Sequence, residues 1–437
     1  MRRRFSSCAF ACLLASGSIM AQSQQQLTVD ELFKLVESGS KSLHAQKTNV
    51  EVAQRAIDMA KDQRLPNIDA SLSVSYTGNV LMTDRDMGNM RGISTPHFGN
   101  SLAVEAQQVV YAGGAINGGI KMAELQKAQS ENSVMLTRNE NRFLALSQYL
   151  ELVKLENGIK VYDSNIALTQ QLIADIKAKQ AQGMALKNDV TRYELQMESL
   201  KLGKRQLEDQ KSILNHQLCN TLDLQDVTVV PEIDLKQAAE ELQVLSEIEI
   251  QDEAVQQSPL LKQSALSTQI AEQQLVLAKS DLLPKVAIVA ANHFSGPFNY
   301  DLPPIDKNFN IWYIGVGVKY SISSLFKGDN KLRKVKEQIR LCQNTHEVVK
   351  ENVNNNIQQA YTLHRQAFVE LRTQQKSVEL ANQNYQVVNN RYLNQLALIT
   401  DMIDASNIKL NAGLQEVNAR IQIAYTYYKL KFVAGSI

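Results

Sequence analysis

The chain of 437 residues repeats one plan twice, and this duplication limits the folds open to it more than any other feature. Leu65-Pro66 recurs as Leu283-Pro284, and each pair ends a long polar stretch of helical character. In both halves two β-like stretches follow, and then come a very long helix, a short turn and a returning helix. Each half is therefore predicted to run helix, strand, strand, long helix, turn, helix.

The boundaries of the two repeats follow from this order. The predicted divisions are a first repeat, an inter-repeat linker and a second repeat over 22–222, 223–245 and 246–437. The four predicted strands, two in each repeat, cover 67–80, 98–111, 285–298 and 310–323. The turns between the long and the returning helices are predicted at 183–186 and 395–398.

The predicted strands alternate apolar and polar residues over most of their length. Between 312 and 322 the even positions are apolar, whereas the odd positions include Gly315, Gly317 and Lys319. This pattern fits a membrane strand between lipid and a wet lumen, and it also fits a half-solvated soluble sheet. Length favours the membrane, since about 9–11 tilted residues cross a bilayer whereas soluble strands average ~5–6.

Four strands cannot close a barrel in lipid, because open sheet edges are not tolerated in hydrocarbon. If the strands cross a membrane, several copies of the chain must therefore pool them. The long helices, predicted near 115–182 and 329–393, carry polar residues throughout, so neither is expected to cross a membrane lengthwise. Heptad spacing such as Ile159, Ile166 and Ile173 predicts coiled-coil packing. The fold class expected is mostly α with a membrane β-barrel portion.

The first 21 residues are predicted to be a signal peptide. Arg2-Arg3-Arg4 precedes a short apolar run, and Ala21 offers a small residue for cleavage. A membrane anchor is the weaker alternative, because the run is shorter than the ~20 residues that a span needs. Cys219 and Cys342 would remain after cleavage, and we expect them to be buried rather than joined in a disulfide.

No pattern in the sequence predicts catalysis. Lys+Arg 46 against Asp+Glu 45 leaves no basic surplus for nucleic acid. The six histidines lack metal-ligand spacing, and neither a phosphate-binding loop nor a nucleophile elbow occurs. We therefore expect no enzyme activity, no cofactor and no metal.

Taken together, these features resemble the TolC family of outer-membrane channels, also described as outer membrane efflux proteins. The likeness covers about 27–433 and includes the Leu-Pro pairs, Tyr111-Ala112-Gly113-Gly114 and the two small-residue turns. It implies a homotrimer with a twelve-stranded β-barrel in the outer membrane of a Gram-negative bacterium. A long α-helical barrel would then reach across the periplasm, with the linker in an equatorial girdle.

The resemblance also implies a function and partners. The chain would be the exit duct of a tripartite efflux pump or of a type I secretion system. It would work with a periplasmic membrane-fusion adaptor and with an inner-membrane RND or ABC transporter. A secreted structural coiled-coil or filament protein is the alternative, since it explains the heptads but not the lipid-like alternation of the strands.

In the family, a ring of aspartates narrows the periplasmic entrance. The segment Ile399–Ala405 resembles that motif and assigns the aperture to Asp401 and Asp404. Residues three apart share a helix face, so three chains would aim six carboxylates at one axis. The alternative is that the two aspartates only cap the returning helix.

The family also latches its closed tip, and Tyr392 and Asp189 fall where a tyrosine–aspartate hydrogen bond is expected. An arginine that often helps is replaced by Ala397, and Gln395 stands where a glycine is usual. Tyr392 is equally well explained as a heptad core residue. The adaptor is expected to dock on the two turns, through Gly183, Met184, Ala185, Leu186, Leu396, Ala397 and Leu398.

Overall fold

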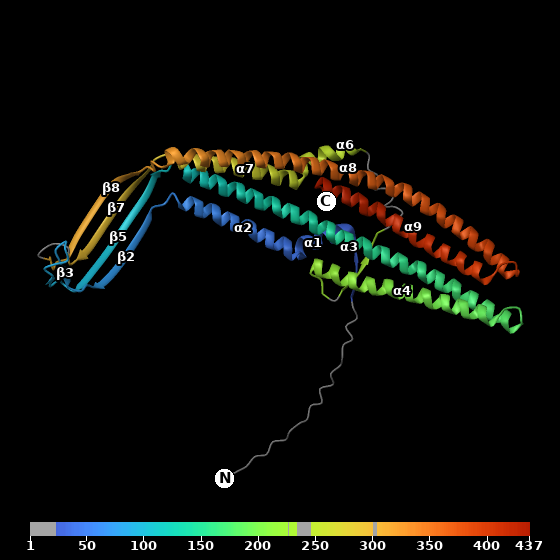
Figure 1. Cartoon of the computed structure of the whole chain (residues 1–437). Helices are drawn as coiled ribbons and strands as arrows, with labels where there is room; N and C mark the ends of the chain where they lie inside the picture. Colours follow the sequence, from blue (N-terminus) through green and yellow to red (C-terminus); the bar gives the residue numbers. More distant parts are fainter. Residues whose placement is uncertain (1–22, 226, 234–245, 300–303) are drawn as a thin grey trace, which may run out of the picture. The chain divides into compact units, whose positions relative to one another are not determined.

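A computed structural model describes residues 23–225, 227–233, 246–299 and 304–437 (Figure 1). The predicted signal peptide and residues 234–245 of the predicted linker lie outside this described part. The chain forms two compact units. The sheet unit comprises the described residues within 41–140, 244–364 and 428–437, and the hairpin unit comprises those within 1–40, 141–243 and 365–427.

The described elements repeat in the predicted order. In the first repeat they are α2 (Lys41–Asp62), β2 (Asn67–Tyr76), β5 (Phe98–Tyr111), α3 (Ala115–Ala181) and α4 (Lys187–Leu222). In the second repeat they are α7 (Pro259–Ser280), β7 (Lys285–Gly296), β8 (Phe309–Lys319), α8 (Ser324–Leu393) and α9 (Ile399–Ala434). The remaining elements are β1 (Ser23–Leu27), α1 (Val29–Gly39), β3 (Val80–Met82), β4 (Arg91–Ile93), β6 (Val227–Pro231) and α6 (Glu247–Gln257).

The sheet unit contains one four-stranded antiparallel sheet in the order β2-β5-β7-β8 (Figure 1). The register aligns Ile68, Ala106, Ala290 and Ile314 in one row across all four strands. Three strands end a few residues before the predicted limits. β8 ends at Lys319 because the chain turns there, where the Ser324 amide donates to the Ser321 carbonyl. The short β3–β4 hairpin lies inside a predicted loop and was missed.

The apolar face of the sheet is open to solvent in a single chain. Leu72 is 73% exposed and Trp312 is 71% exposed, although both belong to the predicted apolar faces. Within the described residues, β2 and β8 each pair with one strand only, so two backbone edges stay unpaired. An apolar face with two open edges is the form that a fragment of a closed membrane barrel would have.

Two of the long helices, α4 and α8, carry apolar side chains that stay exposed to solvent in the single chain. Leu195 and Leu202 lie seven apart on α4, as do Leu380 and Val387 on α8, and all four are more than half exposed. Spacing of seven is the repeat of a coiled-coil seam, so these stripes indicate packing against other protein surfaces. Within the described part of the chain, no helix is both long and apolar enough to cross a bilayer.

The hairpin unit is held at one end by β1 and β6, which pair in parallel. The buried Tyr149 hydroxyl of α3 donates to the Leu27 carbonyl at 2.8 Å and ties this small sheet to the long helix. A capping box starts α1, because Thr28 and Glu31 each bond the other's backbone amide. Cys219 is buried, Cys342 is half-buried, and both are free thiols.

Gly113 makes the turn between β5 and α3 possible. Its φ of +61° is left-handed, and a Cβ there would lie 2.8 Å from Leu283 Cβ and 2.9 Å from the Ser280 carbonyl oxygen. Gly114 also has a positive φ, of +88°, but a Cβ there would meet nothing within 4 Å. The first-repeat turn thus packs directly on the Leu-Pro pair of the second repeat.

Substitutions at these two glycines distinguish the cost of backbone strain from the cost of a steric collision. We expect Gly114→Ala to destabilise the protein by roughly 1–2 kcal/mol, from the left-handed backbone alone. Gly113→Ala adds overpacking of roughly 1–3 kcal/mol, so its loss should be clearly larger. Denaturant unfolding in detergent, followed by circular dichroism, measures both. Equal losses would contradict the close contact with Leu283.

Candidate functional site

Two turns with the same backbone geometry close the helical hairpins of the hairpin unit. Gly183 and Gln395 adopt left-handed φ values of +74° and +63°. In the first turn the Gly183 and Met184 amides donate to the carbonyls of Gln180 and Lys179, and in the second the Gln395 and Leu396 amides donate to those of Tyr392 and Arg391. Both are Schellman C-caps, for which glycine is the usual residue. Gln395 therefore holds a strained conformation that Gly183 adopts freely.

Two equivalent aspartates begin the returning helices. The Asp189 carboxylate accepts from the Leu186 amide at 3.2 Å, and the Asp401 carboxylate accepts from the Leu398 amide at 3.0 Å. Each satisfies a backbone donor that the first turn of a helix leaves unpaired. Asp401 thus caps its helix, a role that the capping hypothesis gave to both Asp401 and Asp404. The shared Leu-x-x-Asp spacing is a sequence signal of this role.

Asp404 has no part in the cap. Asp401 and Asp404 are both exposed, whereas Met402 and Ala405 on the same helix are buried. Helical spacing of three places each pair on one face, so α9 turns a carboxylate face outward and an apolar face into the unit. A single chain does not test whether that outer face borders a pore.

The apolar face belongs to a core shared by four helices. Leu172 and Ile176 of α3, Val190 and Tyr193 of α4, and Tyr385 of α8 contribute to it, together with Ile399, Met402 and Ala405 of α9. The Tyr193 hydroxyl is fully buried and has no hydrogen-bond partner among the described residues. Burial raises the pKa of Tyr193, and the nearby Tyr392 and Tyr385 hydroxyls raise it further. Tyr193 was not singled out in the sequence analysis.

The predicted latch residues lie near each other but are not bonded. Burial raises the pKa of Tyr392, and the Asp189 charge raises it further. The hydrogen bond that the structure gives to the Asp189 carboxylate comes from Leu186, and Tyr392 packs against the apolar core. The Lys179 ammonium lies 5.7 Å from the Tyr392 ring centre and donates to the Leu393 carbonyl. The latch hydrogen bond stays a prediction.

The turns themselves present apolar side chains to solvent. Met184, Leu186, Leu396 and Leu398 are 50–70% exposed, while Ala185 and Ala397 are half-buried. Four large apolar side chains at the ends of two hairpins are more than a turn needs for its own stability. Such exposed groups are typical of a contact surface for another protein.

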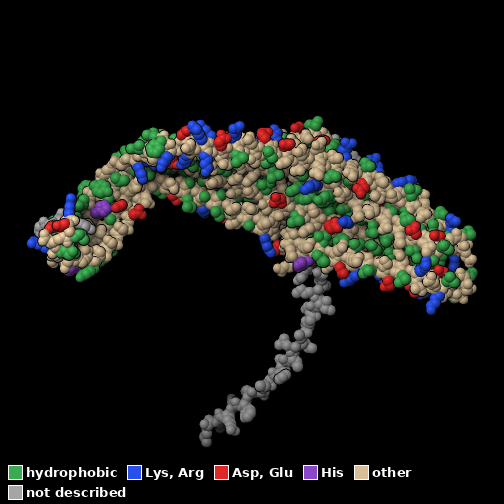
Figure 2. All heavy atoms as spheres, in the orientation of Figure 1, with side chains coloured by type: hydrophobic (Ala, Val, Ile, Leu, Met, Phe, Trp, Pro, Cys, Tyr) green, Lys and Arg blue, Asp and Glu red, His purple; other side chains and the backbone are tan. Residues whose placement is uncertain are grey.

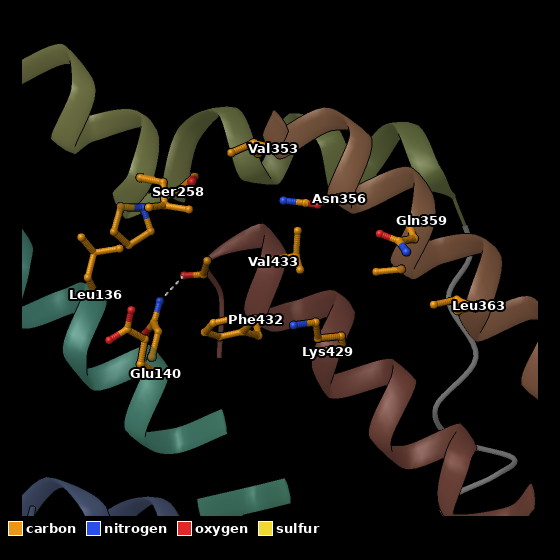
Figure 3. Close-up of a pocket in the computed structure, with 15 residues that line it drawn as sticks. Leu136, Glu140, Ser258, Val353, Asn356, Gln359, Leu363, Lys429, Phe432 and Val433 are labelled. Atoms are coloured by element: carbon orange, nitrogen blue, oxygen red, sulfur yellow. Dashed lines mark hydrogen bonds between the residues drawn. The ribbon is translucent and has the colours of Figure 1, made fainter. Parts of the chain in front are cut away.

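A separate cavity of about 330 Å³ lies in the sheet unit, where the end of α9 meets the start of α7 (Figure 3). Phe432, Val433 and Leu363 give it an apolar lining. The Asn139 amide donates to the Gly435 carbonyl across one side at 3.2 Å. Among the described residues no group of acidic, histidine or cysteine side chains could hold a metal ion. We interpret the cavity as a packing gap at a junction of helices.

The sheet with its open edges and the paired hairpins make up a fold that is also found in solved outer-membrane channels. Residues 250–436 match the family model described as outer membrane efflux protein. The second half of the chain thus carries that family's sequence pattern, and the predicted resemblance is confirmed. The family consists of channels, not enzymes.

Solved structures with the same fold extend the match to almost the whole chain. The CusC channel is 12% identical with a TM-score of 0.79, covering 94% of this chain and 92% of CusC. VceC, an outer membrane protein of Vibrio cholerae, is 14% identical with a TM-score of 0.73, covering 93% and 96%. The Campylobacter jejuni CmeC channel is 14% identical with a TM-score of 0.72, covering 100% and 94%. No curated protein sequence matches the chain.

The strained Gln395 yields a prediction about local stability. Gln395→Gly should remove left-handed strain of roughly 1–2 kcal/mol, offset in part by the roughly 0.5–1 kcal/mol entropy of glycine. Hydrogen exchange of the amides beside this turn should therefore slow several-fold.

Gly183→Ala is the matched control, because a Cβ there meets nothing within 4 Å and only the backbone opposes it. Exchange at the first turn should then become faster. Unchanged exchange in both variants would show that neither turn limits local opening.

Proposed function

We propose that this chain forms the outer-membrane exit duct of a tripartite efflux pump or of a type I secretion system. The four-stranded sheet carries the proposal, since its apolar face is exposed and both of its edges are open. Lipid would cover the face and neighbouring copies would pair the edges. The channel fold and the family match support the same function.

The assembly that suits these edges is a homotrimer. Three copies with four strands each would close a barrel of twelve strands in the outer membrane of a Gram-negative bacterium. The exposed heptad stripes of α4 and α8 would pack between copies as a helical barrel in the periplasm. Passage through such a duct is passive, so the chain needs no cofactor.

The gate would lie at the hairpin ends. Asp401 and Asp404 would form the aperture, and their exposed side supports this role. A ring of carboxylates attracts cations and repels anions. Tyr392 and Asp189 would contribute to the closed state through the latch, which forms once neighbouring hairpins are in place.

Single-channel recording in a planar bilayer tests both the duct and its aperture. Wild type should form stable cation-selective pores. Asp404→Asn removes a charge that makes no helix cap, so cation over anion permeability should fall toward unity. Reversal potentials across a KCl gradient measure this ratio.

Asp189→Asn is the control for capping, because Asp189 has the same N-terminal role in α4 that Asp401 has in α9. Because Asp189 is also a proposed latch residue, the quantity compared is the selectivity of open pores. Asp189→Asn should leave this selectivity unchanged, whereas Asp401→Asn should lower it. If Asp189→Asn and Asp401→Asn act alike, Asp401 is a cap only. A protein that stays soluble without detergent and forms no pores would instead be a structural coiled-coil protein.

The exposed side chains of the turns would dock a periplasmic membrane-fusion adaptor, which in turn connects to an RND or ABC transporter. Leu396→Ser with Leu398→Ser should weaken adaptor binding by about a hundredfold or more, because two buried leucines at about 1.5–3 kcal/mol each are worth roughly 3–6 kcal/mol. Little adaptor should then be recovered after cross-linking in cells. Pores in a bilayer should stay normal. Ile248→Ser, at a 69% exposed site on α6, should leave the recovery unchanged. Equal loss in both variants would argue against docking at the turns.

A further inference from the structure

The polar face of the four-stranded sheet is its more crowded side. Ala103 of β5 and Ala287 and Ala291 of β7 lie on this face and are buried. Ala106 and Ala290 lie on the apolar face of the same two strands and are only half-buried. Side chains crowd together on the concave side of a curved sheet, so the polar face is the inner one. In the proposed barrel this face would line the lumen.

A second cavity lies on the side of this polar face, where β7 and β8 meet the start of α8. It measures about 400 Å³, and we call it the lysine cavity because its lining includes Lys285, Lys319, Lys327 and Lys331, with one acid, Asp281. Gly328 is buried and a Cβ there would collide with Leu282, so α8 packs tightly against the end of α7. The backbone that carries the lysines of α8 is thus held in place.

Two of these lysines stand opposite each other. The register pairs Lys285 of β7 with Lys319 of β8, and both side chains are exposed. Like charges directly opposite each other across strands destabilise a sheet. The pair therefore contributes nothing to holding the two strands together, which indicates another role for its charge.

The one acid of the cavity is already engaged. The Asp281 carboxylate contacts Lys331 at 2.6 Å and Lys285 at 3.5 Å. Within the described residues, Lys319 and Lys327 have no ion-pair partner. The cavity therefore keeps a positive charge that its own lining does not neutralise.

The acids of the polar face lie far from the lysine cavity. Asp69 and Glu105 pair in one row of the sheet, and that row continues to Ala291, six residues along β7 from Lys285. At ~3.3 Å per residue this separation is about 20 Å, roughly twice the Debye length of about 10 Å. Glu105 also has the His293 imidazole nearby, at 3.8 Å. The acidic row and the lysines therefore act on an ion at separate levels of the sheet.

The start of α8 adds to the positive potential at this junction. The N-terminus of a helix carries partial positive charge. Figure 2 shows basic side chains gathered over the part of α8 next to the sheet. The helix therefore reinforces the charge of the lysines that end the two strands.

The first repeat lacks such a group. Asn67 follows Leu65-Pro66 as Lys285 follows Leu283-Pro284, and the register pairs Asn67 with uncharged Gln107. The helix after these strands begins Ala-Ile-Asn-Gly-Gly, without a basic residue before Lys121. The lysine cavity is therefore a property of the second repeat and not of the duplicated fold.

We propose that Lys285, Lys319 and Lys327 form a basic belt that lines the pore at the base of the barrel and favours the passage of small anions. The proposal rests on the proposed function, because it takes the polar face to enclose a lumen. Each copy would add its lysines to one ring, and a ring of positive charge attracts anions. The proposed acidic aperture favours cations, so the duct would contain two charge filters of opposite sign.

Reversal potentials of open pores of the full-length protein, across a KCl gradient in a planar bilayer, test the belt. Lys285→Gln with Lys319→Gln should raise the ratio of potassium to chloride permeability by about twofold or more. The rise should be larger when Asp404→Asn is also present, because the acidic aperture then no longer dominates. An unchanged ratio in both backgrounds would overturn the belt and assign the lysines to ion pairs with a neighbouring copy.

The first repeat offers a reciprocal variant. Asn67→Lys with Gln107→Lys places two lysines on the same polar face at the corresponding end of the other strand pair. The permeability ratio should then fall, opposite to the effect of the glutamine variant. This variant also decides the case if the glutamine variant fails to assemble. A ratio that does not fall would contradict a lumen bordered by this end of the sheet.

Neighbouring positions of β8 test which face lines the pore. Lys319→Cys should react with a negatively charged methanethiosulfonate reagent in the open pore, and the permeability ratio should rise. Val318→Cys is the matched control, because successive strand residues point to opposite faces and Val318 lies on the apolar one. The wild type, with Cys219 and Cys342, gives the response of the native thiols. Equal responses at positions 318 and 319 would overturn the belt.

The recordings also keep the two proposals apart. Pores whose selectivity ignores every change at the lysine cavity would sink the belt and leave the duct standing. If the wild type forms no pores, the duct itself fails and the belt fails with it.

Discussion

The constraint on which this molecule depends is that its sheet is incomplete. Backbone N–H and C=O groups along the outer sides of β2 and β8 have no partner within the described chain, and the apolar rows beside them face solvent. In hydrocarbon each such group would cost several kcal/mol, so the sheet is stable there only when other copies complete it. The exposed heptad stripes on α4 and α8 pose the same requirement for the helices. The folded state of this chain in a membrane thus depends on its assembly with other copies.

The two repeats build equivalent turns and helix starts, partly with different residues. Both hairpins end in the same C-cap and begin their returning helices with an aspartate at the same position. The first turn has Gly183 where the second has Gln395, so the second hairpin is strained at its end. The tyrosines of the core come from two helices, and the buried Tyr193 hydroxyl has no partner among the described residues. The hairpin ends therefore keep less stability than their packing would allow, as expected if the proposed gate lies there.

Much of the fold could be predicted from the sequence, because two periodicities are strong. Alternation over ten or more residues predicted the four strands of the sheet, and Leu-Pro with the small-residue turns predicted where the helices begin and end. The β3–β4 hairpin escaped because each strand has only three residues, too few to show alternation. The left-handed backbone at Gln395 was not predicted, although the glycine that is usual at this position was a signal for it. The lysine cavity escaped for another reason, since only the register reveals that Lys285 and Lys319 face each other.

The order of strands in the sheet also decides how copies can meet. β5 and β7 pair at the centre, so the two repeats are joined there and each supplies one outer strand. One edge of every protomer is therefore a first-repeat strand and the other a second-repeat strand. If such unlike edges join head to tail, they generate a closed ring when the rotation between copies closes, rather than a two-fold dimer. A ring of this kind has no stable partial form, because any missing copy leaves both kinds of edge bare in lipid. One protomer with a defective edge would then disable its sound neighbours as well as itself.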